Sequence, residues 1–397
     1  MIITLVTDQF FQNNHGTSIS AQRLYNGLVS KGHTVRVVSI DEGNNTLYAL
    51  KERYFGKLIT KIINSQGFQF GKPDKETMMK AFEGSDVVHV YMPFKLGKKA
   101  IQLCREMNIP CTAAFHLVPE NITSTIYLNK IKLANKVLWD SFYNSTYKFI
   151  PHIHTPSLMV AKQLANHKFK SKLHVISNGY NDIFKVQPQE KPDIFKDKIV
   201  INFVGRFSRE KRHDLIVNAV NESKYRDKIQ LVFAGKGPRK KAIMKMARKL
   251  PIYPMFTFLS REQVVNLHNY SDLYIHPAEI EVEGMSCLEA VACGCVSIVS
   301  DSPKSASSQF VVHEMSTFKH GDYKDLAAKI DWWIEHPEEH SAQHAILAEH
   351  AKQYQLEKSM NYYIDMFESA IKDWKCDYNG KKKAKCENTK IINYYTK

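Results

Sequence analysis

The sequence predicts an α/β protein of two doubly wound domains, and three observations lead to this prediction. The chain has 397 residues, which is too long for a single ordinary hydrophobic core. Near its start, an apolar strand at Ile2–Val6 is followed by a loop with a glycine, a helix and a second strand. The same succession begins again at Ile199–Val204, so each half is expected to form its own parallel sheet.

In the first half, the loop after the first strand contains Gly16, and a helix over 18–31 and a strand over 34–40 are expected to follow. This loop lacks the G-x-G-x-x-G pattern of dinucleotide-binding domains, which disfavours a nicotinamide oxidoreductase. Further strands are predicted at 86–90 and 111–115, with His116 at the end of the latter. From the residues alone, a turn glycine and a polar strand-end histidine remain open interpretations.

Basic residues alternate with apolar and aromatic ones in two stretches of the first half, 48–70 and 127–149. The net charge of +15 favours an anionic partner such as a membrane surface, a nucleic acid or a nucleotide. Helices with one basic and one apolar face suit an anionic membrane, although an ordinary helix packed on a core shows the same pattern. The predicted membrane-binding residues are Lys57, Lys61, Lys130, Lys132, Lys136 and Trp139.

Composition changes mark the expected domain boundaries. A first domain is predicted over 1–185, and a stretch rich in proline, lysine and acidic residues over 186–198 is taken as a linker. A second domain over 199–355, a helix over 356–376 and a basic, mobile tail over 377–397 complete the chain.

A basic loop follows the first strand of the second domain. Gly205 stands at the strand end, and four basic residues follow within the next seven positions, among them Arg206 and Lys211. A glycine and cations at the carboxyl end of a strand are typical of a phosphate-binding loop, and a solvated basic loop is the simpler alternative.

An acidic loop lies between a predicted strand at 271–277 and a short helix that begins at Met285. Three glutamates precede Gly284, and a further glutamate, Glu289, lies inside the helix. The helix start suits a phosphate, and Glu281 and Glu289 can flank such a ligand, one on a sugar hydroxyl and one on a ribose. Ser286 and Glu289 also form a capping-box pattern, which needs no ligand. Repulsion among the three acids indicates a functional role for them.

The segment from Glu281 to Gly294 resembles the signature of the family 4 retaining glycosyltransferases. In that signature a glutamate is followed, after seven residues, by a second glutamate, then alanine, and then a small residue directly before Cys-Gly or Ser-Gly. The matching residues here are Glu281, Glu289, Ala290, Val291, Ala292, Cys293 and Gly294, with Val296 in place of a usual proline. The resemblance implies the GT-B fold, in which two Rossmann-like domains face a cleft.

The same resemblance implies roles for individual residues. It places the donor diphosphate on Arg206 and Lys211, a sugar hydroxyl on Glu281, and His116 toward the donor sugar, and these four are the predicted catalytic residues. Charge on the leaving diphosphate would then be stabilised electrostatically. The predicted donor-binding residues are Gly16, Gly205, Glu283, Gly284, Met285, Ser286 and Glu289. The helix at 356–376 is expected to cross back to the first domain, which binds the acceptor and the membrane.

A narrower resemblance, to the bacterial diacylglycerol glucosyltransferases, rests on the residues around Glu283 and on the pairs Ser302-Pro303, Ser305-Ala306 and Gln309-Phe310. It implies transfer of a hexose, such as glucose from UDP-glucose, to 1,2-diacylglycerol at the inner face of the cell membrane. A soluble or polysaccharide acceptor is the alternative within the class. A basic nucleic-acid-binding protein is the alternative outside it, although no nucleic-acid-binding module is recognisable.

Other classes of protein and site are disfavoured by composition. The seven cysteines are odd in number and scattered, so we expect a reducing cytoplasm and no disulfide framework. No partner cysteine or histidine pair stands at zinc spacing near Cys293-Gly294-Cys295, and no Asp-x-Asp motif is present, so neither a metal nor another cofactor is expected beside the nucleotide sugar. No apolar run reaches the length of a membrane span, and the N-terminus reads as a strand and not as a signal peptide.

Overall fold

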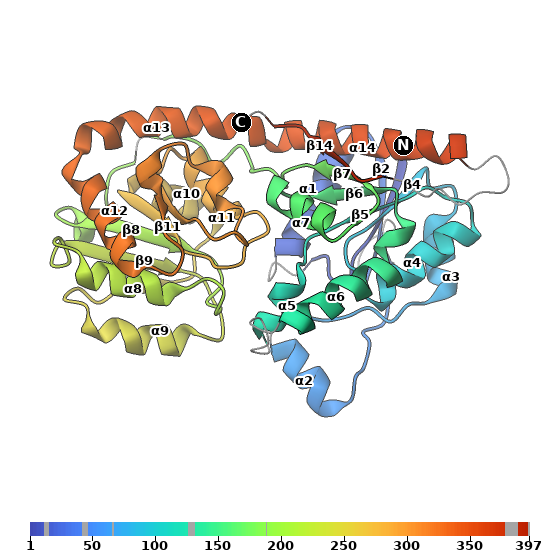
Figure 1. The fold of residues 1–397 in the computed structure, drawn as a ribbon, viewed down its shortest axis with the longest axis horizontal. Coiled ribbons are helices and arrows are strands. Elements are labelled where there is room, and N and C mark those ends of the chain that lie inside the picture. The colour runs from blue at the N-terminus through green and yellow to red at the C-terminus, as the bar shows by residue number, and fades with distance from the viewer. Residues whose placement is uncertain are drawn as a thin grey trace. The chain divides into compact units, whose positions relative to one another are not determined.

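The computed structural model describes residues 1–11, 16–41, 47–65, 67–125, 132–187, 189–377 and 388–395. The chain forms two compact units (Figure 1). Unit 1 contains Met1–Asn178 and Leu356–Lys397, and unit 2 contains Gly179–Gln355. The chain therefore enters unit 2 at Gly179, ahead of the expected linker, and returns to unit 1 at Leu356.

Unit 1 is built on a parallel sheet. Within the described residues the sheet has eight strands in the order β14-β7-β6-β5-β4-β1-β2-β3. The strands are β1 Ile2–Val6, β2 Thr34–Ser39, β3 Leu47–Ala49, β4 Val87–Val90, β5 Cys111–Ala114, β6 His152–Thr155, β7 Lys172–Val175 and β14 Lys390–Asn393. The chain reverses its direction of travel across the sheet between β1 and β4, and in open parallel sheets ligands bind at such a point.

Helices cover both faces of this sheet, with α14 on one side and α4 and α6 on the other (Figure 1). Apolar residues of α1 and α14 pack with β1, β2 and β4 in one buried cluster, which includes Leu24 of α1 and Phe367 of α14. The helices of unit 1 are α1 Gly16–Ser30, α2 Lys57–Ser65, α3 Lys75–Phe82, α4 Lys95–Glu106, α5 Pro119–Thr125, α6 Lys132–Ser145, α7 Leu158–Asn166 and α14 Leu356–Asp377.

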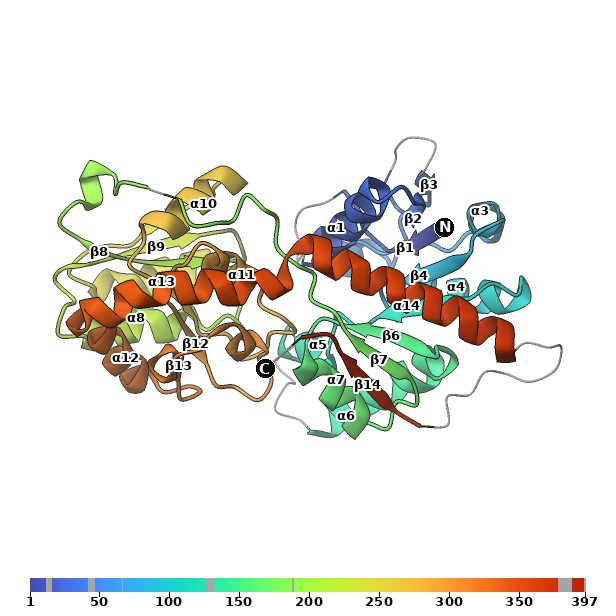
Figure 2. The ribbon, with the colours of Figure 1, turned by 90° about the horizontal axis from the view of Figure 1, so that it is seen from above.

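The last strand, β14, was not expected from the sequence, which predicted a mobile tail. It pairs in parallel with β7 and lies beside it in Figure 2. Two tyrosines after the strand fix this end of the chain: the hydroxyl of Tyr394 lies 3.0 Å from Nδ1 of His174, and that of Tyr395 accepts a hydrogen bond of 2.6 Å from the N–H of Ser177. Residues 388–395 are therefore part of the unit 1 sheet, whereas the lysine-rich part of the predicted tail lies outside the described residues.

Unit 2 repeats the parallel architecture with six strands among the described residues, in the order β10-β9-β8-β11-β12-β13. The strands are β8 Ile199–Val204, β9 Ile229–Ala234, β10 Met255–Thr257, β11 Leu273–His276, β12 Ser297–Ser300 and β13 Thr317–Phe318. The helices are α8 His213–Glu222, α9 Lys240–Met246, α10 Arg261–Tyr270, α11 Met285–Ala292, α12 Tyr323–Glu335 and α13 Pro337–Ala351. The predicted α/β class with two doubly wound domains is confirmed.

The basic, amphipathic stretch at 48–70 is not one long helix. Its start belongs to β3, which pairs with β2, and the helix α2 begins only at Lys57. Gly56, with φ of 93°, directly precedes the helix in a backbone conformation that residues with side chains rarely adopt. The helix is therefore short, and it exposes both apolar and basic side chains.

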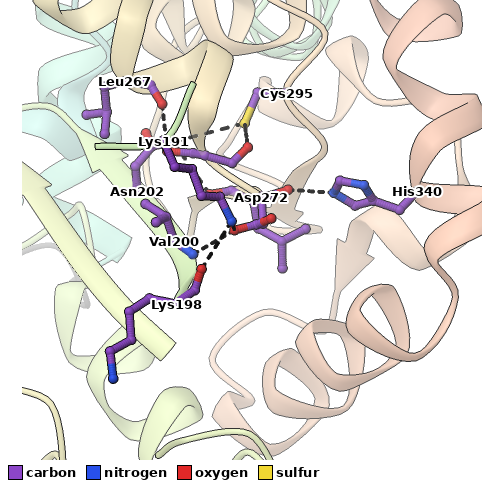
Figure 3. Close-up of polar contacts among 10 residues, drawn as sticks. Lys191, Lys198, Val200, Asn202, Leu267, Asp272, Cys295 and His340 are labelled. Atoms are coloured by element: carbon purple, nitrogen blue, oxygen red, sulfur yellow. Dashed lines mark hydrogen bonds and ion pairs between the residues drawn. The ribbon is translucent and has the colours of Figure 1, made fainter. Parts of the chain in front are cut away.

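At the amino ends of the unit 2 strands, Asp272 ties three segments together (Figure 3). Its Oδ2 accepts hydrogen bonds from the N–H of Val200 at 2.7 Å and from Nζ of Lys191 at 2.6 Å. Its carbonyl oxygen accepts a bond of 2.6 Å from Nε2 of His340 on α13. Ligands of parallel sheets bind at the opposite, carboxyl edge, so we assign this cluster a structural role.

We expect replacement of Asp272 by alanine to lower the free energy of unfolding by about 1–3 kcal/mol, because it leaves the buried N–H of Val200 without an acceptor. Urea unfolding measures this loss. The matched control is Lys191→Met, which keeps the bond to Val200 and removes a partly exposed ion pair and a hydrogen bond to the carbonyl of Lys198, and which should cost less than about 1 kcal/mol. Equal costs for the two variants would show that the ion pair, and not the bond to Val200, stabilises this edge.

Candidate functional site

Two loops of opposite charge meet at the carboxyl edge of the unit 2 sheet. The strands β8 and β11 are parallel neighbours, and the chain reverses its direction across the sheet between them. The loop 205–212 follows β8 and is called the basic loop here, and the loop 277–284 follows β11 and is called the acidic loop. Because both strands end at the same edge, both loops lie where ligands of doubly wound sheets bind.

The two loops contact each other through backbone and charge. The N–H of Glu279 donates a hydrogen bond of 2.8 Å to the carbonyl of Glu210. Nζ of Lys211 forms an ion pair with Oε2 of Glu281, and Arg212 lies 3.7 Å from a carboxylate oxygen of Glu279. The Lys211 and Glu281 side chains are only 17% and 15% exposed, so their ion pair is shielded from water.

Glu281 is held as a carboxylate. Burial opposes its ionisation, but Lys211 and His276 outweigh burial and lower the pKa of Glu281 to about 2. The backbone of Glu281 is fixed as well, because its N–H donates to the carbonyl of Lys304 and its carbonyl accepts from the N–H of Ala306, each at 2.9 Å. The loop after β12 thus holds the backbone of the acidic loop in place through these two hydrogen bonds.

Helix α11 begins at the end of the acidic loop, and Gly284 makes that start possible. This residue precedes the helix with φ of 95°, and a Cβ there would lie 2.6 Å from Oγ of Ser307. Any other residue would strain the backbone and clash. The amino end of α11 therefore lies beside Glu281, where its N–H groups and dipole favour an anion.

The basic loop approaches a second glycine loop closely. The N–H of Gly205 donates to the carbonyl of Ala234 at 2.9 Å, and a Cβ on Gly235 would lie 1.9 Å from the carbonyl oxygen of Gly205. Arg206 follows Gly205 and is partly buried, which lowers the pKa of its guanidinium while Glu210 opposes that change. Arg206 and Lys211 thus place two cations on one short loop at the ligand-binding edge.

The other predicted donor-binding residues of unit 2 lie at the start of α11 or just before it. Met285, Ser286 and Glu289 are partly exposed residues of the helix. Glu283 is only 1% exposed, and its carboxylate adds to the effect of burial in raising the pKa of Tyr354 to about 12. Glu283 is thus an interior residue of the loop, whereas Glu281 and Glu289 keep some exposure.

In unit 1, His116 follows β5 and is buried among other aromatic side chains. Its ring stacks on Tyr91 at 5.5 Å and contacts His154 at 5.0 Å, and its Nε2 lies 3.4 Å from Oγ of Ser20. Burial, with smaller contributions from His154 and His89, lowers the pKa of His116 well below its ordinary value. His116 is therefore a neutral imidazole at neutral pH and acts as a hydrogen-bonding group, not as a cation.

Gly16, the remaining predicted donor-binding residue, is the exposed first residue of α1. The loop that leads to it follows β1, which is one of the two strands at the reversal point of the unit 1 sheet. Gly16 thus lies at a helix start, at the edge where ligands of such sheets bind.

The prediction that Trp139 binds a membrane is wrong. Trp139 is 2% exposed, and its ring stacks on Phe115 at 5.4 Å and on His167 at 4.2 Å. The apolar side of α6 at Trp139 therefore packs on the core of unit 1, which is the ordinary arrangement for an amphipathic helix. Lys136 lies on the exposed side, Lys132 is the first residue of α6, and Lys130 lies outside the described residues.

Helix α2 presents exposed apolar side chains together with basic ones. Leu58 is 72% exposed, Ile59 is 54% exposed, and Tyr54 just before the helix is 71% exposed. Lys57 and Lys61 of the same helix are exposed as well. These five residues are called the α2 patch below. Exposed apolar residues gathered on one short helix mark an interaction surface more often than isolated ones do.

Within the described residues, no group of three or more histidine, cysteine, aspartate or glutamate side chains has an arrangement that could hold a metal ion. None of the helices described here combines the length and the apolar character that crossing a bilayer requires.

Sequence reasoning missed two residues that contact the candidate site, Tyr274 and His276 of β11. Nε2 of His276 lies 3.1 Å from Oε2 of Glu281, and its Nδ1 lies 2.8 Å from the hydroxyl of Tyr274. Residues two apart on a strand share a face, so their alternation in the segment Leu273–His276 was a usable signal. From the sequence, both residues are predicted only as parts of a strand.

Comparisons with known proteins agree with the division of the chain into two units. Residues 15–182 match the family model described as Glycosyltransferase Family 4, and residues 186–354 match the model described as Glycosyl transferases group 1. A GDP-mannose-dependent alpha-mannosyltransferase of Corynebacterium glutamicum is 23% identical over 310 residues, which are 75% of this chain and 72% of that protein. An alpha-monoglucosyldiacylglycerol synthase of Streptococcus pneumoniae is 24% identical over 327 residues, 76% of this chain and 72% of that protein.

Among solved structures, sucrose-phosphate synthase from Thermosynechococcus elongatus superposes with a TM-score of 0.74. It is 15% identical and covers 94% of this chain and 99% of that chain. The likeness extends over both units.

Proposed function

Because this chain combines a domain that matches the Glycosyltransferase Family 4 model with one that matches the Glycosyl transferases group 1 model, it belongs to the GT-B glycosyltransferases, and we propose that it glucosylates a membrane lipid. The donor is UDP-glucose, the acceptor is 1,2-diacylglycerol, and the anomeric configuration is retained. The enzyme acts from the cytoplasmic side, as a peripheral protein on the inner face of the cell membrane.

The donor half of this proposal is carried by one observation. The basic loop, the acidic loop and the amino end of α11 converge at the reversal point of the unit 2 sheet, with Lys211 and Glu281 in contact. A nucleotide sugar needs cations and helix N–H groups for its diphosphate and a carboxylate for a sugar hydroxyl. Arg206 and Lys211 would bind the diphosphate, Glu281 the hexose and Glu289 the ribose.

Transfer then requires two bond changes at the anomeric carbon. The bond from this carbon to the diphosphate oxygen breaks, and a bond to the acceptor hydroxyl oxygen forms on the same face of the sugar. The acceptor proton passes to the leaving phosphate oxygen. Negative charge grows on the diphosphate as it leaves, so preorganised cations at Arg206 and Lys211 would stabilise the transition state more than the bound donor. His116 would donate a hydrogen bond toward the sugar as a neutral imidazole.

The acceptor half is supported by charge, by the α2 patch and by one relative. The net charge of +15 favours an anionic surface, where each basic residue contributes about 1 kcal/mol to binding. The α2 patch offers apolar side chains for insertion beside lysines for anionic headgroups. The Streptococcus relative is named for the synthesis of a glucosylated diacylglycerol.

The test is a transfer assay with labelled UDP-glucose and vesicles. We expect label in the lipid fraction with diacylglycerol in anionic vesicles, and much less with diacylglycerol in zwitterionic vesicles. A sterol in anionic vesicles tests whether any interfacial hydroxyl is accepted. Release of UDP without a lipid product would contradict the acceptor assignment and leave the transferase assignment intact.

A second candidate donor is GDP-mannose, which the name of the Corynebacterium relative favours. The same assay with labelled GDP-mannose decides between the donors. A product that appears equally with soluble acceptors and without vesicles would instead favour the soluble-acceptor alternative.

The α2 patch gives a separate prediction. We expect Lys57→Gln together with Lys61→Gln to weaken binding to anionic vesicles by about 30-fold, which corresponds to roughly 2 kcal/mol for two lysines. Leu58→Ser with Ile59→Ser should weaken binding in both anionic and zwitterionic vesicles, because it removes inserted apolar area. Co-sedimentation with vesicles measures both effects.

The matched control for the apolar pair is Ile346→Ser on α13, which also removes an exposed aliphatic side chain, 47% exposed. It should leave vesicle binding unchanged. If the α2 variants and this control bind alike, the α2 patch does not contact the membrane.

A further inference from the structure

We propose that His276 is the positioning residue of Glu281, at the end of a chain of hydrogen bonds that starts at Ser286. Nε2 of His276 lies 3.1 Å from Oε2 of Glu281, and Nδ1 lies 2.8 Å from the hydroxyl of Tyr274. The same hydroxyl lies 2.9 Å from Oγ of Ser286 on α11. His276 and Tyr274 are both fully buried. The role given to Glu281 rests on the proposed function.

The direction of each hydrogen bond in this chain follows from the charge of Glu281. A carboxylate can only accept, so Nε2 of His276 must carry the hydrogen. Burial lowers the pKa of His276, so its ring is neutral and Nδ1 carries no hydrogen. Nδ1 therefore accepts from the hydroxyl of Tyr274, and the oxygen of Tyr274 accepts from the hydroxyl of Ser286.

This direction limits what Ser286 can do. Its single hydroxyl hydrogen is used by Tyr274, so the side chain has no hydrogen left for a donor phosphate. Ser286 was predicted to bind the donor, and its backbone N–H at the start of α11 is the group suited to that. The side chain instead links the amino end of α11 to Glu281.

The chain also selects the oxygen of Glu281 that meets the substrate. Lys211 and His276 both contact Oε2, from the basic loop and from β11 respectively. Among the described residues no hydrogen bond or ion pair reaches Oε1, which leaves this oxygen for a sugar hydroxyl. An oxygen fixed from two sides cannot rotate freely, and a carboxylate misplaced by about 1 Å can cost on the order of 100-fold in rate.

The first measurement needs no activity. Nitrogen-15 labelling of the 17 histidines in the full chain, followed by NMR of the ring nitrogens at pH 7, reports the tautomer of each ring. The His276 signals are those absent from His276→Gln. We expect a neutral ring with the hydrogen on Nε2. A hydrogen on Nδ1 or a protonated ring would overturn the proposed direction of the chain.

The second measurement uses two substitutions, each of which keeps a nitrogen near the position of one of the two ring nitrogens. His276→Gln places an amide nitrogen near the position of Nε2, and His276→Asn places one near Nδ1. We expect kcat to fall at least about tenfold in the asparagine variant, with KM for the donor changed less than about twofold, and the glutamine variant to recover most of kcat. Equal losses in both variants would overturn the positioning role, because a purely structural histidine would not distinguish them.

A histidine at the other edge of the sheet is the control. Nε2 of His340 donates to the carbonyl of Asp272, so His340→Asn also removes a hydrogen bond within unit 2. It should lower the melting temperature without changing kcat. If the unmodified enzyme transfers no sugar at all, the proposed function fails, and the tautomer measurement still decides whether His276 holds Glu281.

Discussion

Replacing Glu281 with glutamine should lower kcat/KM for sugar transfer by about 100-fold or more. The substitution keeps the shape of the side chain and removes its charge, so the bond to His276 and the proposed bond to a sugar hydroxyl both become neutral and about half as strong. Loss of one preorganised electrostatic group at a transition state commonly costs 100- to 1,000-fold. Steady-state kinetics with labelled donor measure the change.

Glu279 supplies the matched control for this prediction. It belongs to the same acidic loop, and its carboxylate lies 3.7 Å from Arg212 with the side chain 31% exposed. Glu279→Gln should change kcat/KM by less than about fivefold, because a partly exposed ion pair contributes little. Circular dichroism must show both variants folded. If Glu281→Gln works as well as Glu279→Gln, the carboxylate of Glu281 does not act on the substrate.

The contrast between these two glutamates shows what the sequence could and could not predict about the site. The strand 199–204 and the helix after Gly284 follow from apolar runs and from a glycine at a helix start, which are local signals. That the basic and acidic loops share an edge also follows, because parallel strands end on the same side. The partner of each acid does not follow: Lys211 and Glu281 are 70 positions apart, and only the folded sheet brings them together.

Unit 1 shows two further limits of sequence reasoning. Every second residue of the strand His152–Thr155 is a histidine. Hydropathy counts histidine as polar, yet His152 and His154 are both buried. Their burial is possible because Nε2 of His152 lies 2.8 Å from Asp373 of α14 and Nε2 of His154 lies 2.7 Å from the carbonyl of Ile176. Helix α14 reaches this position from the far end of the chain.

Trp139 illustrates the second limit. A helix with lysines on one side and large apolar residues on the other has the same pattern whether the apolar side meets a membrane or a core. Trp139 meets the core, whereas Leu58 and Ile59 of α2 remain exposed. Periodicity identifies the faces of a helix, and only the tertiary structure shows what covers each face.

The largest effect on stability is expected from Lys211→Met. This substitution keeps the aliphatic stem and leaves the carboxylate of Glu281, which is 15% exposed, without its cation. Removing one partner of a buried ion pair typically costs 3–5 kcal/mol, so urea unfolding at pH 7 should show a loss of that size. Transfer activity should fall as well, because the diphosphate would lose a cation.

The pH dependence of this loss identifies its cause. In the native enzyme the pKa of Glu281 is lowered from 4.5 to about 2, so its stabilising effect is complete above pH 4.5 and disappears as the pH falls toward 2. In Lys211→Met the cation that most strongly lowers the pKa of Glu281 is gone, so burial raises that pKa. The difference in unfolding free energy between the two proteins should therefore be largest above about pH 5 and shrink toward pH 3.

The double variant Lys211→Met with Glu281→Gln separates the charge from the packing. If an unpaired carboxylate destabilises Lys211→Met, neutralising that carboxylate should recover most of the lost stability, and the double variant should be more stable than the single one. If the double variant is as unstable as the single one at every pH, the loss arises from packing around Lys211, and the ion pair does not fix the acidic loop. Recovered stability without recovered activity would show that the ion pair of Lys211 and Glu281 has two separate roles. Stability would depend on not leaving the carboxylate unpaired, whereas activity would need both charges.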